Sequence, residues 1–221
     1  MESQSHSTEH IHTQIRSLPI PTLSNNQVTL LDQLVIDAEI FQAVSQLDPL
    51  KTPGPDGIPV AFYQNYWSIV KKDVLQMVHA VFHSGFLLKS LNYSFITLIP
   101  KTLTPETVSQ FRPISLCNVT YKIISKVLVN RLKPIMDSLV TLYQNAFIQG
   151  RQITDNIILA QEVFEYMKRK HKGKWGYGAL KIDMNKAYDR LSWNFFKAVM
   201  LTMAFSCKWI SWVSQCVSTV S

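Results

Sequence analysis

The sequence predicts a mixed α/β (α+β) fold in which helices predominate. Apolar residues recur at helical spacing along most of the chain, whereas only short segments combine the β-branched and aromatic residues typical of strands. Hydrophobic residues make up 47% of the 221 residues and charged residues 17%, which excludes a mainly disordered or collagen-like chain. We expect helices over residues 31–47, 62–82, 119–133, 154–172 and from 193 onward, and strands over 93–99, 111–116 and 179–184.

Residues 1–30 predict a flexible linker. They contain few apolar residues, show no sustained period and include Pro19 and Pro21. The pattern changes at Leu31, where regularly spaced apolar residues begin. We therefore place a single folded region over residues 31–221.

The first two expected helices flank a rigid turn. The helix over 31–47 ends before Pro49, because proline cannot continue a helix. Residues 51–57 (KTPGPDG) then contain two prolines, which fix φ, and two glycines, which permit positive φ. Helical spacing resumes over 62–82, and Gly85 is a suitable stop.

Two strands precede the next helix. Residues 93–99 and 111–116 have strand composition and are separated by a polar loop. Asn118 is a candidate cap for a helix over 119–133, which has one apolar face. At 100° per residue, three lysines of this helix fall within about 40° of arc on the opposite face. They are Lys122, Lys126 and Lys133.

The C-terminal part predicts a helix, a turn, a short strand and a final helix pair. The helix over 154–172 ends in basic residues, as the helix dipole favours. Three glycines between 173 and 178 precede the strand over 179–184, so they predict a hairpin turn rather than a phosphate-binding loop, which follows a strand. The helix pair begins at about Trp193.

The charge distribution indicates a polyanionic partner. The formal net charge is +7, but residues 1–60 hold two basic and seven acidic residues, a balance of −5. The remaining 20 basic and eight acidic residues give the rest of the chain +12. A basic excess confined to one part of the chain is typical of nucleic-acid binding.

The sequence also predicts an intracellular, non-secreted protein. Its three cysteines (Cys117, Cys207 and Cys216) are widely spaced and form no disulfide framework or zinc motif. The N-terminus lacks the apolar core of a signal peptide. The apolar run over 198–220 is interrupted by Lys208 and Gln215, so we expect a buried or amphipathic helix there and no membrane partner.

Asp183 is the first candidate site residue. It lies at the end of the apolar strand expected over 179–184, where an unpaired buried charge is costly. Carboxylates in such places commonly hold Mg²⁺. The alternative is a surface ion pair with Lys181 or Lys186. By contrast, His79 and His83 lack the glutamate of a metalloprotease helix, and no hydrolase triad is visible.

Basic residues interleaved with aromatic ones form a second candidate site. In proteins with this pattern, the basic side chains bind the phosphate backbone of a nucleic acid and the aromatic side chains pack against its sugars or bases. The one-sided lysine stripe on the helix over 119–133 favours this interpretation over a scattered cationic surface. The candidate nucleic-acid ligands are Lys122, Lys126, Lys133 and Arg151, with Lys101 and Arg112 nearby in the sequence.

Six motifs in one order resemble the reverse transcriptase of plant LINE-type (non-LTR) retrotransposons. Each alone is moderately specific, but together they cover roughly residue 30 to the end. The motifs are 51–57 (KTPGPDG), 95–101 (FITLIPK), 111–116 (FRPISL), 121–132 (YKIISKVLVNRL), 144–151 (QNAFIQGR) and 181–193 (KIDMNKAYDRLSW).

The resemblance implies an RNA-directed DNA polymerase that acts on an RNA template, a DNA primer and dNTPs. Asp183 matches the first metal-binding aspartate of the palm, and two Mg²⁺ ions are expected in the complete enzyme. Tyr188 matches the aromatic gate that excludes a 2′-hydroxyl. Lys101 and Arg112 match the fingers residues that grip the triphosphate.

The sequence departs from the family pattern after Asp189. No Asp or Glu follows that residue, so the family's second carboxylate motif (Tyr/Phe-Ala-Asp-Asp) is missing. We therefore expect fingers over about 31–175 and a first palm segment over 176–221, with little or no polymerisation by this chain alone. The alternatives are a non-catalytic nucleic-acid-binding remnant and a decayed fragment that does not fold stably. A retrotransposon protein is compatible with a nuclear location.

Overall fold

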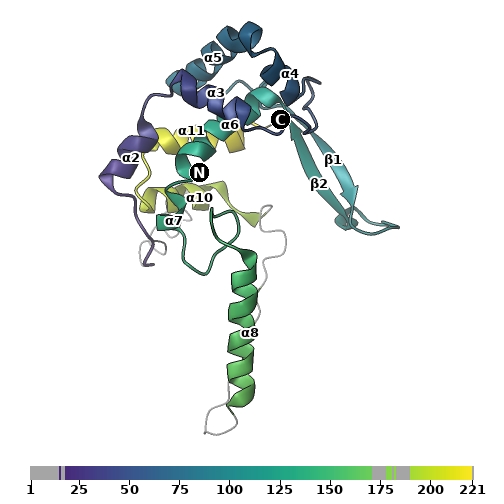
Figure 1. Cartoon of the computed structure of the whole chain (residues 1–221), viewed down its shortest axis with the longest axis vertical. Coiled ribbons are helices and arrows are strands. Elements are labelled where there is room, and N and C mark those ends of the chain that lie inside the picture. Colours follow the sequence, from purple (N-terminus) through teal and green to yellow (C-terminus); the bar gives the residue numbers. More distant parts are fainter. Residues whose placement is uncertain (1–14, 16–17, 171–177, 181, 183–189, 221) are drawn as a thin grey trace, which may run out of the picture. The chain divides into compact units, whose positions relative to one another are not determined.

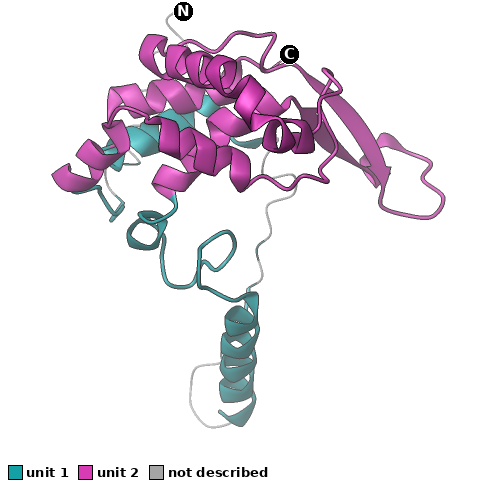
Figure 2. Ribbon diagram, turned by 45° about the horizontal axis from the view of Figure 1, so that its top comes forward, with its two compact units in different colours: residues 1–24, 133–204 teal, residues 25–132, 205–221 magenta. Residues whose placement is uncertain are grey.

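The computed structural model describes residues 15, 18–170, 178–180, 182 and 190–220. Within them, the chain is rich in helices and contains one two-stranded antiparallel sheet (Figure 1), which confirms the expected mixed class with few strands. The chain divides into two compact units, drawn in different colours in Figure 2. Unit 1 comprises residues 1–24 and 133–204, and unit 2 comprises residues 25–132 and 205–221.

The helices of unit 2 enclose its apolar core. They are α2 (Asn25–Asp32), α3 (Asp37–Ser45), α4 (Val60–Asn65), α5 (Trp67–Ser84), α6 (Val119–Leu132) and α11 (Cys207–Ser218). The buried face of each supplies core residues at helical spacing, and Ile40, Val78, Ile123 and Trp209 are all buried. Trp212 packs edge-on against Phe82, which joins α11 to α5. The sequence therefore forms a core from segments that lie more than 100 residues apart.

In place of the single helix expected over 31–47, the structure has the end of α2 and the whole of α3. The break at residues 33–36 follows from a tertiary contact, because Arg131 of α6 donates hydrogen bonds to the backbone oxygens of Leu31, Gln33 and Leu34. The guanidinium thus satisfies carbonyls that would otherwise bond within a continuous helix. In addition, α2 occupies part of the segment 1–30 in which we expected a linker.

The helix expected over 62–82 also has a break, between α4 and α5 at Tyr66, where φ is −108° and ψ is 24°. Its expected stop is confirmed. Gly85 adopts the left-handed conformation with φ of 68°, and its N–H donates to the carbonyl of Val81. A residue with a Cβ is disfavoured at this φ, so glycine ends the helix here.

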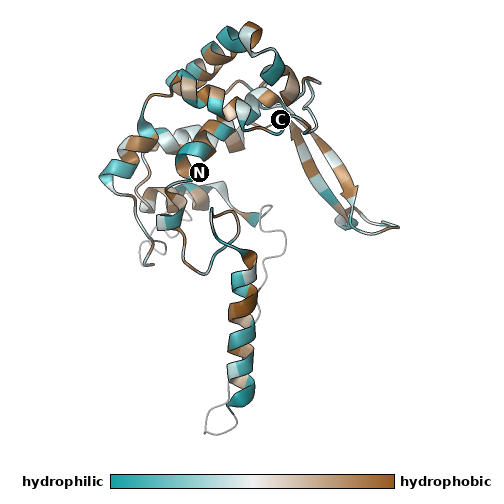
Figure 3. Ribbon diagram, viewed as in Figure 1, coloured by the Kyte–Doolittle hydropathy of each residue, from teal (hydrophilic) through white to brown (hydrophobic). Residues whose placement is uncertain are grey.

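The two expected strands form a hairpin of β1 (Ser94–Pro100) and β2 (Phe111–Cys117). The hairpin projects from the helices of unit 2 (Figure 1), and most of its residues are exposed on both faces. Ile96 and Leu98 are among its exposed hydrophobic residues, and Figure 3 shows hydrophobic colouring along the strands. The hairpin is therefore a two-stranded ribbon rather than one layer of a packed sheet.

Unit 1 contains α7 (Met136–Leu139), α8 (Ile153–Arg169) and α10 (Trp193–Thr202). Its buried residues include Ile135, Leu139 and Met200, whereas α8 has no buried residue. The expected helix over 154–172 is confirmed as α8, and the expected C-terminal helix pair is confirmed as α10 and α11.

The buried strand expected over 179–184 is wrong at the residues that the structure describes. Residues 179, 180 and 182 are not in a strand, and the exposed fractions of Leu180 and Ile182 are 84% and 81%. A strand needs a hydrogen-bonding partner, and in the described part of the chain the only sheet is β1–β2. Separately, no described helix is both long enough and apolar enough to cross a membrane.

Candidate nucleotide and nucleic-acid interface

Lys101 and Arg112 lie on one face of the hairpin. Arg112 pairs directly with Ile99, and the N–H of Lys101 donates to the carbonyl of Gln110 at 2.7 Å, which continues the pairing beyond β1. Because alternate residues of a strand share a face, Lys101 and Arg112 are diagonal neighbours across the two strands. The structure therefore brings together two candidate residues that are eleven positions apart.

Both cations of this pair are exposed. The ammonium of Lys101 donates to the carbonyl of Ser109 at 2.8 Å, which holds it over the loop that joins the strands. Among the described residues, Arg112 has no ion-pair partner. An exposed ammonium beside an exposed guanidinium is suited to a polyphosphate, since the first is a point charge and the second binds two oxygens at once.

Two of the three lysines expected in the stripe lie on α6. Lys122 and Lys126 are half-buried and one turn apart, and the helical period places them opposite the buried Ile124 and Leu128. However, α6 ends at Leu132, so Lys133 lies beyond the helix and belongs to unit 1. The physical reason is Pro134, which disfavours helical geometry in the residue before it.

The turn at residues 51–57 packs against the start of α6. The side-chain oxygen of Asn118 accepts the N–H of Asp56 at 3.2 Å, and Lys122 donates to the carbonyl of Thr52 at 3.0 Å. Asn118 is buried, and its side chain links the turn to the residue between β2 and α6. The proline-glycine motif is thereby fixed beside Lys122.

Arg151 has a structural role in unit 1. Its side chain is only 11% exposed and pairs with Asp137, and it also donates to the carbonyls of Thr141 and Gln144. Because these partners occupy most of its five donors, the guanidinium has little capacity left for phosphate. The expectation that Arg151 binds nucleic acid is not supported by this geometry.

Sequence reasoning missed Arg131, the buried cation of unit 2. It pairs with Glu39 through two hydrogen bonds of 2.7 and 2.8 Å. Burial raises the pKa of Glu39, but the hydrogen bonds from Arg131 and the Ile36 N–H, with the guanidinium charge, outweigh burial and hold the pKa below its ordinary value of 4.5. The position of Arg131 four residues after the buried Val127 was the signal that could have found it.

Tyr121 also has a structural environment. Its hydroxyl donates to the carbonyl of Cys216 at 3.3 Å. Burial, and to a smaller degree the nearby Cys216 and Cys117 thiols, raise the pKa of Tyr121 to about 12. Tyr121 therefore joins α6 to α11 as a neutral phenol and does not serve as a base-stacking surface.

Asp183 and Tyr188 lie outside the described residues, so their geometry is not part of the site described above. Among the residues that are described, no group of three His, Cys, Asp or Glu side chains is placed to hold a metal ion.

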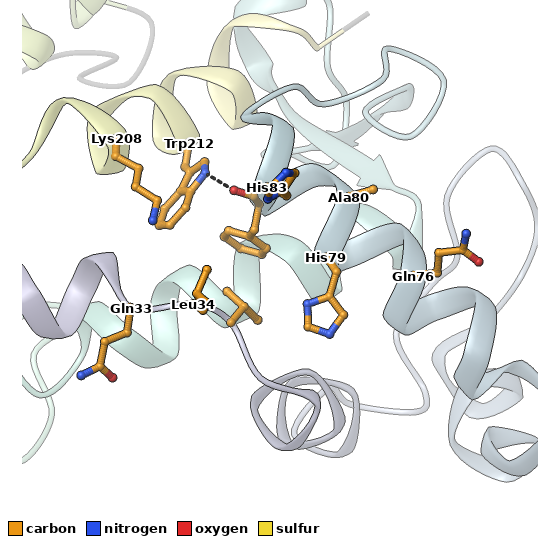
Figure 4. Close-up of a pocket in the computed structure, with 10 residues that line it drawn as sticks. Gln33, Leu34, Gln76, His79, Ala80, His83, Lys208 and Trp212 are labelled. Atoms are coloured by element: carbon orange, nitrogen blue, oxygen red, sulfur yellow. Dashed lines mark hydrogen bonds between the residues drawn. The ribbon is translucent and has the colours of Figure 1, made fainter.

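Unit 2 also contains a cavity of about 450 Å³, and none of the predicted site residues that the structure describes lines it. Its apolar lining includes Leu34 and Trp212, and His79, His83 and Lys208 also line it (Figure 4). The ammonium of Lys208 lies 4.9 Å from the Trp212 ring. None of the described residues that line this cavity is a carboxylate, so this lining does not suit Mg²⁺, which takes oxygen ligands.

Comparison with known proteins identifies a family for this chain. The sequence profile described as "Reverse transcriptase (RNA-dependent DNA polymerase)" matches residues 99–221, which include Lys101 and Arg112. The matched region also contains Asp183 and Tyr188.

Several relatives are proteins of transposable elements. The "Transposon TX1 uncharacterized 149 kDa protein" of Xenopus laevis is 25% identical over 88% of this chain and 15% of its own length. The "Probable RNA-directed DNA polymerase from transposon BS" of Drosophila melanogaster is 26% identical over 83% of this chain and 20% of its own length. The R2DM "Retrovirus-related Pol polyprotein" of the same species is 24% identical over 81% of this chain and 17% of its own length.

The chain thus spans about a fifth or less of the length of these curated relatives. The family that the six motifs resemble is confirmed at the level of reverse transcriptases related to proteins of retrotransposable elements. Because the profile covers more than half of the 221 residues, the chain belongs to the reverse transcriptase (RNA-dependent DNA polymerase) family.

Proposed function

We propose that this chain forms the fingers and the beginning of the palm of a non-LTR retrotransposon reverse transcriptase, with fingers over about 31–175 and palm over 176–221. The observation that carries the proposal is the placement of Lys101 and Arg112 on one exposed face of the β1–β2 hairpin. Family membership supports it, because both residues lie in the matched region. The substrates would be an RNA template, a DNA primer and dNTPs.

In this proposal Lys101 and Arg112 bind the triphosphate of the incoming dNTP. The bidentate guanidinium fixes the orientation of the phosphates, and the ammonium adds charge where the hairpin turns. Tyr188 lies beneath the sugar and excludes a 2′-hydroxyl. Asp183 is a ligand for Mg²⁺, which, when bound, supplies the positive charge that phosphoryl transfer requires.

Lys122 and Lys126 are proposed to contact the phosphate backbone of the template or primer. The two lysines lie on successive turns of the same face of α6. This spacing suits contact with successive phosphates of a nucleic acid. Lys122 is also held near the 51–57 turn, which fixes its position before binding. We leave Lys133 and Arg151 out of this surface for the reasons given above.

These 221 residues contain no acidic residue after Asp189, so the family's second palm carboxylate is not among them. We therefore propose that they bind nucleotide and nucleic acid and do not polymerise on their own. Polymerisation requires the partner carboxylate from additional polypeptide.

The test is equilibrium binding of a fluorescent dNTP in the presence of MgCl₂. Arg112→Ala should weaken binding about tenfold or more, because a hydrogen-bonded charge contributes about 1.5–3 kcal/mol. Lys72→Ala removes an exposed cation of α5, outside the hairpin, and serves as the control. Equal affinities for the two variants would refute the role of the hairpin.

A non-catalytic nucleic-acid-binding protein is the second candidate function, favoured by the cationic face of α6. It predicts RNA affinity that falls with salt, with a log-log slope of about −0.7 for each phosphate neutralised. Salt-dependent RNA binding without dNTP binding would favour this candidate over the first.

A further inference from the structure

The loop between α7 and α8 exposes an aromatic pair. The exposed fraction of Phe147 is 92%, and that of Tyr143 is 73%. Large aromatic side chains are usually at least partly buried, because burying their large apolar surface away from water is favourable. Two such residues in one loop of a folded unit indicate a surface that meets a partner.

Phe147 also has an unusual backbone conformation. Its φ is 65°, in the left-handed region that glycine occupies readily and that a bulky side chain disfavours. Local folding would be served better by glycine at this position. The side chain of Phe147 therefore contributes little to the stability of the loop and costs backbone strain.

The loop is nevertheless held firmly in place. Arg151 binds the carbonyls of Thr141 and Gln144 and the carboxylate of Asp137, which closes the base of the loop. The buried Asn145 donates to the carbonyl of Gln152 at 2.7 Å and to the side-chain oxygen of Asn156 at 3.1 Å. These bonds lie on both sides of Phe147 and fix the backbone that presents it.

The composition of the loop favours a nucleic acid as its partner. Between Asp137 and Asp155 the sequence has no acidic residue and one basic residue, Arg151, so it does not repel a polyanion. Exposed amides at Gln144 and Gln149 flank the aromatic residue on both sides. An aromatic face beside neutral hydrogen-bonding groups is the usual composition of a base-stacking platform.

We propose that Phe147 is a stacking platform for an unpaired base of single-stranded nucleic acid, with Tyr143 contributing to the same exposed surface. This inference rests on the proposed function, because it requires that the chain binds RNA or DNA. It explains why phenylalanine stands where the backbone favours glycine. The strain is offset by the hydrogen bonds of Arg151 and Asn145.

The test uses the full chain and a 12-nucleotide single-stranded RNA that carries 2-aminopurine, whose fluorescence falls when the base stacks. Phe147→Ala should weaken binding about fivefold to a hundredfold and should abolish the quenching, because stacking on an aromatic residue is worth about 1–3 kcal/mol per base. Phe147→Trp should preserve both affinity and quenching.

Phe147→Gly separates binding from folding. It should lose RNA affinity to the same degree as Phe147→Ala, while its melting temperature equals or exceeds that of the wild type because glycine relieves the strain at φ of 65°. A lower melting temperature with unchanged affinity would assign Phe147 to folding and overturn the proposal.

Further outcomes distinguish this inference from the proposed function. If the wild type binds the RNA with the expected salt dependence but all Phe147 variants bind equally well, the stacking inference fails and the proposed function stands. If the wild type does not bind, both fail. If Phe147→Ala leaves RNA affinity unchanged and abolishes a concentration-dependent self-association in sedimentation experiments, the loop is a protein interface and the stacking proposal is overturned.

Discussion

Gly54 and Asn118 contact each other so closely that no side chain fits between them. A Cβ on Gly54 would lie 2.4 Å from both the backbone nitrogen and the side-chain oxygen of Asn118. The same oxygen accepts the N–H of Asp56. This contact joins the proline-glycine turn to the junction of β2 and α6, so it aligns the turn with the proposed phosphate-binding face of α6.

Gly54→Ala should therefore detach the turn. The added methyl group meets backbone atoms that cannot move independently, and overpacking of this kind costs about 1–3 kcal/mol of unfolding free energy. Urea denaturation measures the cost. Hydrogen exchange gives the local result, since the Asp56 amide should lose its protection.

Gly57→Ala is the matched control. Gly57 has a φ of 70° and nothing within 4 Å of an added Cβ, so alanine should cost only the backbone strain, about 1 kcal/mol. The Asp56 amide should remain protected in this variant. Equal loss of protection in both variants would show that the contact with Asn118 does not hold the turn.

The buried pair of Arg131 and Glu39 predicts a pH dependence of stability. The pKa of Glu39 is lower in the folded protein than its ordinary value of 4.5. The carboxylate therefore contributes stability that is present above about pH 4.5 and is lost as the pH falls through the folded-state pKa. Chemical denaturation between pH 6 and pH 3 should show this loss.

Glu39→Gln should be less stable than the wild type at pH 6, because it leaves the Arg131 charge buried without a partner. Its stability should fall less steeply between pH 5 and pH 3. An identical slope in wild type and variant would mean that other carboxylates dominate acid unfolding.

The three cysteines should differ in reactivity. Burial raises the pKa of the Cys216 thiol to about 11, and the pKa of Cys117 is also raised by burial, partly offset by Lys122. Cys207 is exposed. Titration of the native protein with Ellman's reagent at pH 8 should show one fast thiol, which Cys207→Ser removes. Three fast thiols would indicate that α11 is not packed as described.

Sugar discrimination should depend on Tyr188. In a longer polypeptide that contains the complete palm and polymerises, Tyr188→Val should admit ribonucleotides, because it removes the bulk beneath the sugar. Primer extension with dNTPs and rNTPs measures the change. Tyr188→Phe is the control and should preserve discrimination, so the assigned role requires that the two variants differ.

Local patterns predicted the hairpin and most helices because these elements depend on nearby residues. Apolar spacing found α5 and α6, the charges at its ends indicated α8, and strand composition found β1 and β2. The break between α2 and α3 could not be predicted in this way, since it depends on Arg131, about 100 residues away in the sequence. The same holds for Asn118, whose partner is a turn 62 positions earlier.

The candidate site was also predicted only in part, because some of its side chains depend on residues that are distant in the sequence. Lys101 and Arg112 meet because strand register places them together, and the motifs that contain them were visible. Lys133 lies outside α6 because Pro134 follows it, and helical spacing alone does not register a proline beyond the last turn. The partners of Arg151 could not be predicted, because sequence shows that a guanidinium is present but not which carbonyls it binds.

We propose that Asp183 is a ligand of the magnesium ion that accompanies the nucleotide. Fe²⁺ can replace Mg²⁺ in the presence of dATP and ascorbate, and the radicals it forms cleave nearby backbone. If Asp183 holds the metal, the backbone should be cut beside Asp183, and the cut should be lost in Asp183→Asn. No cut beside Asp183, or a cut that persists in Asp183→Asn, would show that this carboxylate does not hold the metal.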